Sequence, residues 1–442
     1  MGLLEKAQKM LENYPLCNHC LGRQFALLGY GLDDEKRGEA IKILLTMKAN
    51  ELALQGDEDG VSQLNTLATN GSFDMATNVL KKLKKKAGKR RECYLCETRF
   101  EEIPRFVSST IEKLEDYEYN TFLVGIKLPT GVAEKEDEFK AEFDVKYGEA
   151  MRNGFSREIG KKIAEITQKT ADYKTPDMVI IINPFTSKIV LQANPLYITG
   201  RYKKLARGIP QSRWLCPNCR GEGCAECEWT GKVYQESVEE LISRPTLEET
   251  DGEGTAFHAA GREDVDARML GRGRPFVVEV KKPKKRFIEL QDLAKTINER
   301  AEGKVKVQDL RFASKDTVRR LKRKESATKV YKAVVDFDRD VSDEKLEILA
   351  KALTNTVIRQ QTPLRVLRGR ADRIREKYIY EAKIKRLKPN QIEMRIRCQG
   401  GLYIKELITG DEGRTDPNVA QIINAKAEPV RLDVLNIISR GD

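Results

Sequence analysis

Apolar and polar residues follow two different periods along this chain, and these periods predict both helices and strands. Apolar residues spaced by three and four positions over residues 2–14 and 288–297 are typical of amphipathic helices. Short β-branched runs at residues 276–280 and 328–338 predict strands instead. By the same criteria we expect further helices at residues 34–54, 155–167, 235–243, 315–323 and 342–353. Further strands are expected at residues 121–128, 178–182, 188–193, 304–312, 377–387, 392–398 and 430–438.

The order of these elements indicates an α+β protein with several domains. Strands with irregularly interspersed helices fill the C-terminal half, which predicts a mixed, mostly antiparallel sheet with flanking helices. A smaller α/β region precedes it, and 442 residues are enough for two or three domains. We place the three parts at residues 1–105, 106–200 and 201–442. The stretch 201–214, RYKKLARGIPQSRW, is interpreted as a basic interdomain linker that could also contact RNA.

The charge balance favours a polyanionic partner. The chain carries 80 lysines and arginines against 68 acidic residues, which gives a net charge of +12. Much of the excess lies in basic runs at residues 81–91, 281–286 and 365–375. We expect the first run to form a solvated helix face that could also touch phosphate, and the other two to neutralise phosphates. On charge alone, a generally lysine-rich protein remains an alternative.

Neither a membrane span nor a secretory signal is expected. The sequence contains no run of 18 apolar residues, and the N-terminal segment carries acidic residues without a long apolar stretch. We therefore expect a cytoplasmic protein without a membrane partner, and no obligate protein partner is evident.

Eight of the nine cysteines form four Cys-x-x-Cys pairs, and only Cys398 stands alone. In a reducing compartment this spacing favours metal thiolates over disulfides. Four thiolates around one zinc leave no open position, so we expect structural zinc. The expected ligands are Cys17, Cys20, Cys93, Cys96, Cys216, Cys219, Cys224 and Cys227. The alternatives are independent reduced pairs or one redox pair, and His19 inside the first pair is a further possible ligand.

The stretch 260–280, AGREDVDARMLGRGRPFVVEV, holds the candidate chemistry. Small residues lead into a charged turn in which Asp264 lies between Arg262 and Arg268, and a second, glycine-rich turn, GRGRP, precedes the strand. A cation within a few ångströms lowers the pKa of an aspartate by roughly 1–3 units. An ionised aspartate without a histidine or serine partner favours a nucleophile or a charge stabiliser. A surface loop of mixed charges is the alternative.

Two later stretches, TKVYKAVVDF at 328–337 and CQGGLYIKELIT at 398–409, add to this turn. The three together resemble the ordered motifs of pseudouridine synthases: an Arg-x-Asp turn, a strand with a basic-x-Tyr element, and a Gly-x-Tyr-Ile-basic-x-Leu segment. With QTPLRVLRGRADRIR at 361–375, the detail is similar to the archaeal and eukaryotic tRNA pseudouridine-54/55 synthase family. The resemblance is close from residue 208 onward and looser before it.

The resemblance implies an activity and a set of roles. The family isomerises uridines 54 and 55 in the TΨC arm of tRNA, without an organic cofactor, and carries an RNA-binding domain of the THUMP type where residues 106–200 lie. Asp264 matches the catalytic aspartate, with Asp266 as second choice. Lys405 would pair with it, and Tyr331 would stack on the uracil and assist proton removal. Base extrusion and pocket closure would fall to Arg262, Tyr403 and Leu407.

Two other classes compete with this interpretation. A noncatalytic RNA-binding protein would share the zinc knuckles and basic loops, but the intact Asp264, Tyr331 and Lys405 count against it. A THUMP-linked methyltransferase or thiolase would need a glycine-rich turn that opens a helix. The segment GRGRP precedes a strand instead, so it does not fit a nucleotide-binding turn.

Overall fold

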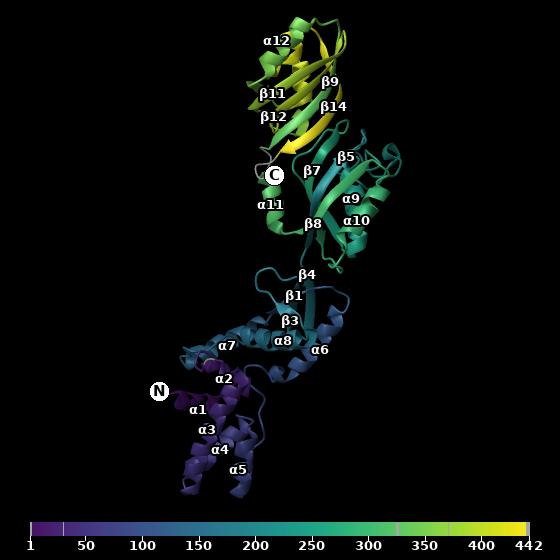
Figure 1. The fold of residues 1–442 in the computed structure, drawn as a ribbon. Coiled ribbons are helices and arrows are strands. Elements are labelled where there is room, and N and C mark those ends of the chain that lie inside the picture. The colour runs from purple at the N-terminus through teal and green to yellow at the C-terminus, as the bar shows by residue number, and fades with distance from the viewer. Residues whose placement is uncertain (1, 30, 324–326, 370, 439–442) are drawn as a thin grey trace. The chain divides into compact units, whose positions relative to one another are not determined.

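The computed structural model of the protein describes residues 2–29, 31–323, 327–369 and 371–438 (Figure 1). The chain divides into two compact units that meet in sequence at Asn194 and Pro195. Strand β5 (Leu196–Lys204) belongs to the sheet of the second unit. Residues 201–204, which we expected in a linker, are therefore strand, because they pair with neighbours on both sides. No helix within the described ranges combines the length and the apolar character that crossing a membrane requires.

The first unit combines a helical part with a four-stranded sheet over one continuous core. The sheet has the order β2-β1-β3-β4, with parallel pairing of β1 to both neighbours and antiparallel pairing of β3 to β4. Its strands are β1 (Thr121–Ile126), β2 (Thr170–Ala171), β3 (Met178–Asn183) and β4 (Lys188–Ala193). Its helices are α1 (Leu3–Asn13), α2 (Asn18–Gly22), α3 (Asp34–Leu54), α4 (Glu58–Thr69), α5 (Asp74–Lys82), α6 (Ile103–Leu114), α7 (Thr130–Glu142) and α8 (Met151–Thr167).

The basic run at residues 81–91 differs from the prediction. Only Lys81 and Lys82 belong to α5, and the rest of the run leaves the helix. Lys84 adopts a positive φ of 56°, and the run then extends without regular structure as far as the next cysteine pair. The run is therefore mostly a connection and not a helix face.

The second unit is built on one ten-stranded sheet, in the order β13-β10-β11-β12-β9-β14-β7-β5-β8, with β6 paired to β7. Only the contact of β14 with β7 is parallel, which confirms the predicted mixed, mostly antiparallel sheet. The remaining strands are β6 (Gly254–Ala259), β7 (Arg268–Lys281), β8 (Val305–Ala313), β9 (Thr328–Phe337), β10 (Thr356–Gln361), β11 (Ile374–Lys388), β12 (Gln391–Gln399), β13 (Thr415–Asp416) and β14 (Ala427–Ile438).

Helices cover this sheet over two separate cores. One core packs α9 (Val238–Thr250) and α10 (Leu290–Arg300) against Val278 of β7. The neighbouring Val277 packs instead against α11 (Lys315–Arg323). Because successive side chains of a strand point to opposite faces, α11 lies on the other face of the sheet from α9 and α10 (Figure 1). The other core joins β9–β12 to α12 (Asp343–Leu353), α13 (Ile404–Thr409) and α14 (Val419–Ile423).

Two predicted element boundaries of this unit are wrong. The helix predicted at residues 235–243 does not end there, because α9 runs through Pro245 to Thr250. The segment GRGRP is not a free turn but part of β7, where Gly271 and Gly273 adopt positive φ of 57° and 75°. A Cβ on Gly271 would lie 1.8 Å from the Leu435 carbonyl oxygen, so these glycines allow close strand contact.

Candidate active site

The candidate site lies where the two halves of the large sheet meet. Asp264 stands in the loop between β6 and β7, in the half that carries α9 and α10. Lys405 comes from α13 and Arg365 from the connection between β10 and β11, both in the other half. Tyr331 of β9 packs against both cores. The parallel pairing of β14 with β7 at Arg268 fixes the two halves at this point.

Two cations hold the Asp264 carboxylate. Arg365 Nη1 lies 3.2 Å from Oδ1, and Lys405 Nζ lies 3.6 Å from Oδ2. Lys405 is nearer to Asp266, at 2.6 Å from its Oδ2, and this contact holds the pKa of Asp266 below its usual value although burial opposes the shift. The Asp264 side chain is 31% exposed against 64% for Asp266. The predicted Asp264, Asp266 and Lys405 are thus brought together, with Asp264 the more enclosed carboxylate.

Arg365 is a site residue that we expected only as part of a basic segment. Its Nε donates a hydrogen bond of 2.5 Å to Glu406 Oε1, and Glu406 is itself buried. Glu406 therefore holds the guanidinium in place while Nη1 remains directed at Asp264. The signal that could have revealed the pair is the acidic residue next to Lys405 in the motif, since a buried carboxylate requires a cation.

The arginines adjacent to Asp264 in sequence do not supply its charge partners, contrary to the expectation from the turn. Arg268 donates to the buried Asp433, with Nε 3.0 Å from Oδ1. The Arg262 guanidinium lies 5.8 Å from the centre of the Trp214 ring, in a cation–π arrangement. Side chains that are close in sequence within a turn point in different directions. The cations that contact Asp264 therefore come from elements distant in sequence.

A layer of buried polar groups supports the loop that carries Asp264. The Lys204 ammonium donates to the carbonyl oxygens of Asp264 and Val265, each at 3.0 Å, and to Ile209 at 2.7 Å. Burial lowers the pKa of Lys204 to about 8. Beside it, Glu263 forms a buried ion pair of 2.7 Å with Arg274. The loop backbone is thereby fixed by groups that the sequence pattern does not reveal, because their contacts span about 60 residues, as between Lys204 and Asp264.

Lys204→Met is expected to loosen this loop. The change removes one donor from each of three carbonyl oxygens. Those of Asp264 and Val265 keep a backbone N–H donor, from Ala267 and Gly208, whereas the Ile209 oxygen has no other donor among the described residues. An unsatisfied buried polar group costs about 1–3 kcal/mol. Amide hydrogen exchange should therefore become faster in peptides covering residues 260–267, and the isomerisation rate should fall. Lys203→Met is the matched control, because the neighbouring side chain points to the other face of β5. Equal exchange in both variants would show that Lys204 does not hold the loop.

The remaining predicted side chains differ in their burial and in their contacts. Burial raises the pKa of Tyr331, and the neutral phenol is favoured. The Tyr403 ring lies 6.0 Å from the Arg365 guanidinium. Leu407 is fully buried in the core under α13. Lys405 thus contacts the Asp264 carboxylate and Tyr403 lies beside its partner Arg365, whereas Leu407 anchors the helix that carries Lys405.

The eight paired cysteines form two four-thiol groups, each within its own unit. Within each group the sulfur atoms all lie within 4.8 Å of one another. One group is Cys17, Cys20, Cys93 and Cys96, and the other is Cys216, Cys219, Cys224 and Cys227. Both groups could hold a metal ion by their donor set. His19 is not in either group, since its ring stacks on Phe100 at 4.6 Å.

Local contacts fit thiolates in both groups. Near the first group the fully buried Lys42 ammonium donates to two backbone carbonyls and Asn18, and no carboxylate pairs with it in the described part of the chain. Buried charges are normally compensated, and metal-bound thiolates would provide this. In the second group the Gly223 and Gly231 N–H groups donate to Cys219 and Cys227 sulfurs, each at 3.2 Å. Such donors stabilise a thiolate.

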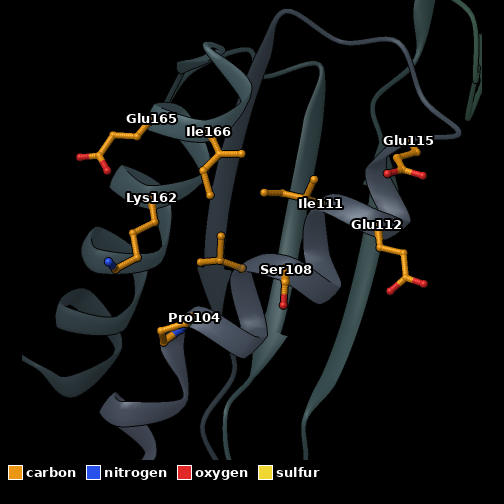
Figure 2. A pocket seen from close by; sticks show the side chains of 9 residues that line it. Pro104, Ser108, Ile111, Glu112, Glu115, Lys162, Glu165 and Ile166 are labelled. Atoms are coloured by element: carbon orange, nitrogen blue, oxygen red, sulfur yellow. The ribbon is translucent and has the colours of Figure 1, made fainter.

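A hollow of about 440 Å³ lies on the first unit between α6 and α8 (Figure 2). Ile111 and Ile166 face into it, and Figure 2 shows glutamates along its rim. The polar lining is Ser108, Glu112, Glu115, Lys162 and Glu165. Three carboxylates against one ammonium disfavour a phosphate ligand, so this hollow is not a candidate for binding a polyanion.

This chain is similar to known proteins over nearly its whole length. Residues 197–438 match the family described as Pus10, C-terminal, and residues 106–183 match the Pus10 THUMP domain, archaeal. A tRNA pseudouridine synthase Pus10 of Methanothrix thermoacetophila is 39% identical over 98% of this chain and 94% of its own length. Its counterpart in Methanocaldococcus jannaschii is 41% identical over 97% and 93%. A solved pseudouridylate synthase is 13% identical, with a TM-score of 0.20 over 56% of this chain and 66% of its own.

The family match over residues 197–438 and the relatives that cover nearly the whole chain identify an RNA pseudouridine synthase, an isomerase. More specifically, the chain belongs to the Pus10 family, and its first unit contains a THUMP domain. The resemblance that the motifs indicated is thereby confirmed.

Proposed function

We propose that this protein isomerises uridines 54 and 55 in the TΨC arm of tRNA, with Asp264 as the nucleophile. The observation that carries the role of Asp264 is its enclosure between Arg365 and Lys405 at the junction of the two sheet halves. The tRNA substrate is supported by the names of relatives that cover nearly the whole chain. The two positions rest on the motif resemblance.

The reaction requires only groups that surround this carboxylate. The N-glycosidic bond between N1 and C1′ breaks, a bond between C5 and C1′ forms, C5 loses a proton and N1 gains one, so no oxidant or group donor is needed. Asp264, as a carboxylate, attacks the ribose or the uracil ring. Arg365 and Lys405 keep it charged and oriented. Tyr331, which stacks on the detached uracil, assists removal of the C5 proton.

Access to the target base requires its extrusion from the stacked loop, which costs a few kcal/mol. We assign to Arg262 the role of filling the space that the base leaves. Its guanidinium lies over the Trp214 ring and the side chain is exposed, so it is available to an incoming RNA. Tyr403 and Leu407 complete the uracil pocket in this proposal, Tyr403 as a lining residue and Leu407 from the core beneath it.

Zinc is the metal that we propose for both four-cysteine groups. Four thiolates favour zinc and leave no coordination position for substrate, so its role is structural. When bound, the ion would link residues 17–20 to residues 93–96 in the first unit and close the loop 216–227 in the second. We assign a metal-stabilised structural role to residues 1–105, RNA binding to residues 106–200 and catalysis to residues 201–442.

Phosphate contacts are proposed at the basic segments. In the segment 281–286 the four lysines are exposed, whereas Arg286 is buried and unsuited to RNA contact. In the segment 365–375, Arg365 serves the site itself, and Arg370 and the Arg368 side chain lie outside the described residues. Each neutralised phosphate makes binding more salt-dependent.

The proposed function predicts pseudouridine at two positions. Purified protein incubated with an unmodified tRNA transcript should yield pseudouridine at positions 54 and 55, detected by carbodiimide treatment and primer extension. A transcript with cytidine at both positions is the control. Pseudouridine at only one position would restrict the proposed specificity to that position. Absence of pseudouridine from both positions would overturn the proposal.

A further inference from the structure

A second hollow, of about 590 Å³, opens on the catalytic unit where β5, β7 and β8 meet α11. Four arginines line it together with a single carboxylate. They are Arg201 of β5, Arg272 of β7, Arg311 of β8 and Arg320 of α11, with Asp309. Its volume lies in the range of about 300–1,000 Å³ that is typical of ligand sites.

Three of the four arginines in this hollow have no carboxylate partner among the described residues. In the ranges that the structure describes, Arg272, Arg311 and Arg320 form no ion pair with a carboxylate. The acidic residue of α11, Asp316, pairs with Arg319 at 2.8 Å, away from this cluster. Like charges that converge on one space repel each other, so the arrangement favours an anionic ligand.

An irregularity in the pairing of two strands lies beside this cluster of arginines. The pairing of β5 with β8 shifts register between Thr199 and Arg201, and Asp309 opposite this shift has a positive φ of 58°. Such a bulge re-aims side chains, and bulges are common beside functional sites. The Arg201 Nε donates a 2.9 Å hydrogen bond to the Arg272 carbonyl oxygen, which fixes one guanidinium against the next strand.

The hollow is also connected to the catalytic loop. Val318 and Leu321 of α11 pack against Ala260, the residue from which the loop to Asp264 departs. The same packing sets Arg320 at the edge of the hollow, on the sheet face opposite α9 and α10. A ligand there would therefore lie on the α11 face, beside the start of the catalytic loop.

We propose that this arginine hollow binds backbone phosphates of the substrate RNA, outside the nucleotide that is isomerised. The inference rests on the proposed function for the identity of the RNA. All four cations are arginines, whose planar fork binds phosphate oxygens in pairs more specifically than a lysine does. The hollow thereby adds a binding site to the three basic segments recognised in the sequence.

The test removes two charges from the hollow and the same number from the opposite face. Arg311→Gln with Arg320→Gln should weaken tRNA binding on the order of tenfold near physiological salt. The slope of log K against log salt should become shallower by roughly 0.7–0.9 for each lost phosphate contact. The single-turnover rate at saturating tRNA should not change. Arg244→Gln with Arg300→Gln, on α9 and α10, is the control and should retain the wild-type slope.

Further variants and ligands distinguish RNA phosphate from free phosphate as the ligand of the hollow. Arg311→Lys with Arg320→Lys should keep the slope but recover only part of the affinity, since charge is retained without the fork. If the glutamine variant binds tRNA like the wild type, the proposal is overturned. The proposal is also overturned if inorganic phosphate stabilises the wild-type fold but not that of the glutamine variant, while both bind tRNA equally. The hollow would then be a site for small anions. Binding is measured separately from pseudouridine formation, so failure of the proposed reaction is distinguishable from failure of the hollow.

Discussion

Asp264→Asn is expected to abolish pseudouridine formation while the fold and the affinity for tRNA remain. The amide keeps the shape of the side chain but is neither charged nor nucleophilic. Removal of a nucleophile costs many orders of magnitude in other enzymes, so the single-turnover rate should fall by a factor on the order of 10⁴ or more. Rate and binding are to be measured on the same transcript. A folded variant with a wild-type rate would overturn the role of Asp264.

The matched control is Asp266→Asn, two residues further along the same loop. Asp266 makes the shorter contact with Lys405, 2.6 Å against 3.6 Å, but it is also the more exposed carboxylate. Its loss should release Lys405 toward Asp264 and leave measurable activity. If Asp266→Asn is inactive and Asp264→Asn is active, the motif is aligned two residues out of register. The comparison thus decides between two carboxylates that both contact the same cation.

The regular elements of this fold could be predicted because their patterns are local. The helix predicted at residues 34–54 coincides with α3, and the strand predicted at 328–338 with β9 to within one residue. Alternating burial along β12 reflects the alternation of apolar residues that is visible in the sequence. The ordered motifs likewise lie on the strand and short helix expected of them, β9 and α13.

Features that depend on distant partners could not be predicted in this way. The glycines of GRGRP indicate a turn by local rules, yet close contact with Leu435 makes the segment part of β7. Strand β6 is not among the predicted strands, because only its pairing with β7 establishes it as a strand. Lys204 carries no local signal for its contacts with the Asp264 loop, and Arg365 has only the indirect signal of Glu406 beside Lys405. The motif thus indicates the loop that carries Asp264, but not the groups that support its charge and its backbone.

Loss of the first four-cysteine group is expected to unfold much of the first unit. Cys17 caps α2 and Cys20 lies within it, whereas Cys93 and Cys96 follow α5, and all four ligands belong to the first unit. Cys20 and Cys96 are fully buried within the unit's single core. Structural zinc binding contributes apparent free energies of about 10–16 kcal/mol in zinc-finger peptides at pH 7, which is comparable to the stability of a whole domain.

The double change Cys20→Ser with Cys93→Ser should therefore have effects that extend well beyond the site. Metal analysis should fall from about two zinc ions per chain, as the four-ligand rule implies, to about one. Amide hydrogen exchange should become fast across α1 to α5, because the link between the two ends of the helical part is lost. Retention of both ions, or of full exchange protection, would contradict this account.

The second four-cysteine group provides the control that separates a local metal loop from a structural centre. Cys219→Ser with Cys227→Ser should also remove about one zinc ion, since the same ligand rule applies. Both residues are only partly buried, in a segment whose pairing within the described residues is a single bridge, Leu215 with Lys232. Faster exchange should thus be confined to residues 214–233, and the sheet that carries Asp264 should keep its protection. Equal destabilisation of both units by the two double variants would show that the metal sites do not act separately. If the two double variants instead show different patterns of amide hydrogen exchange, one ion supports a core and the other closes a loop beside the sheet of the second unit.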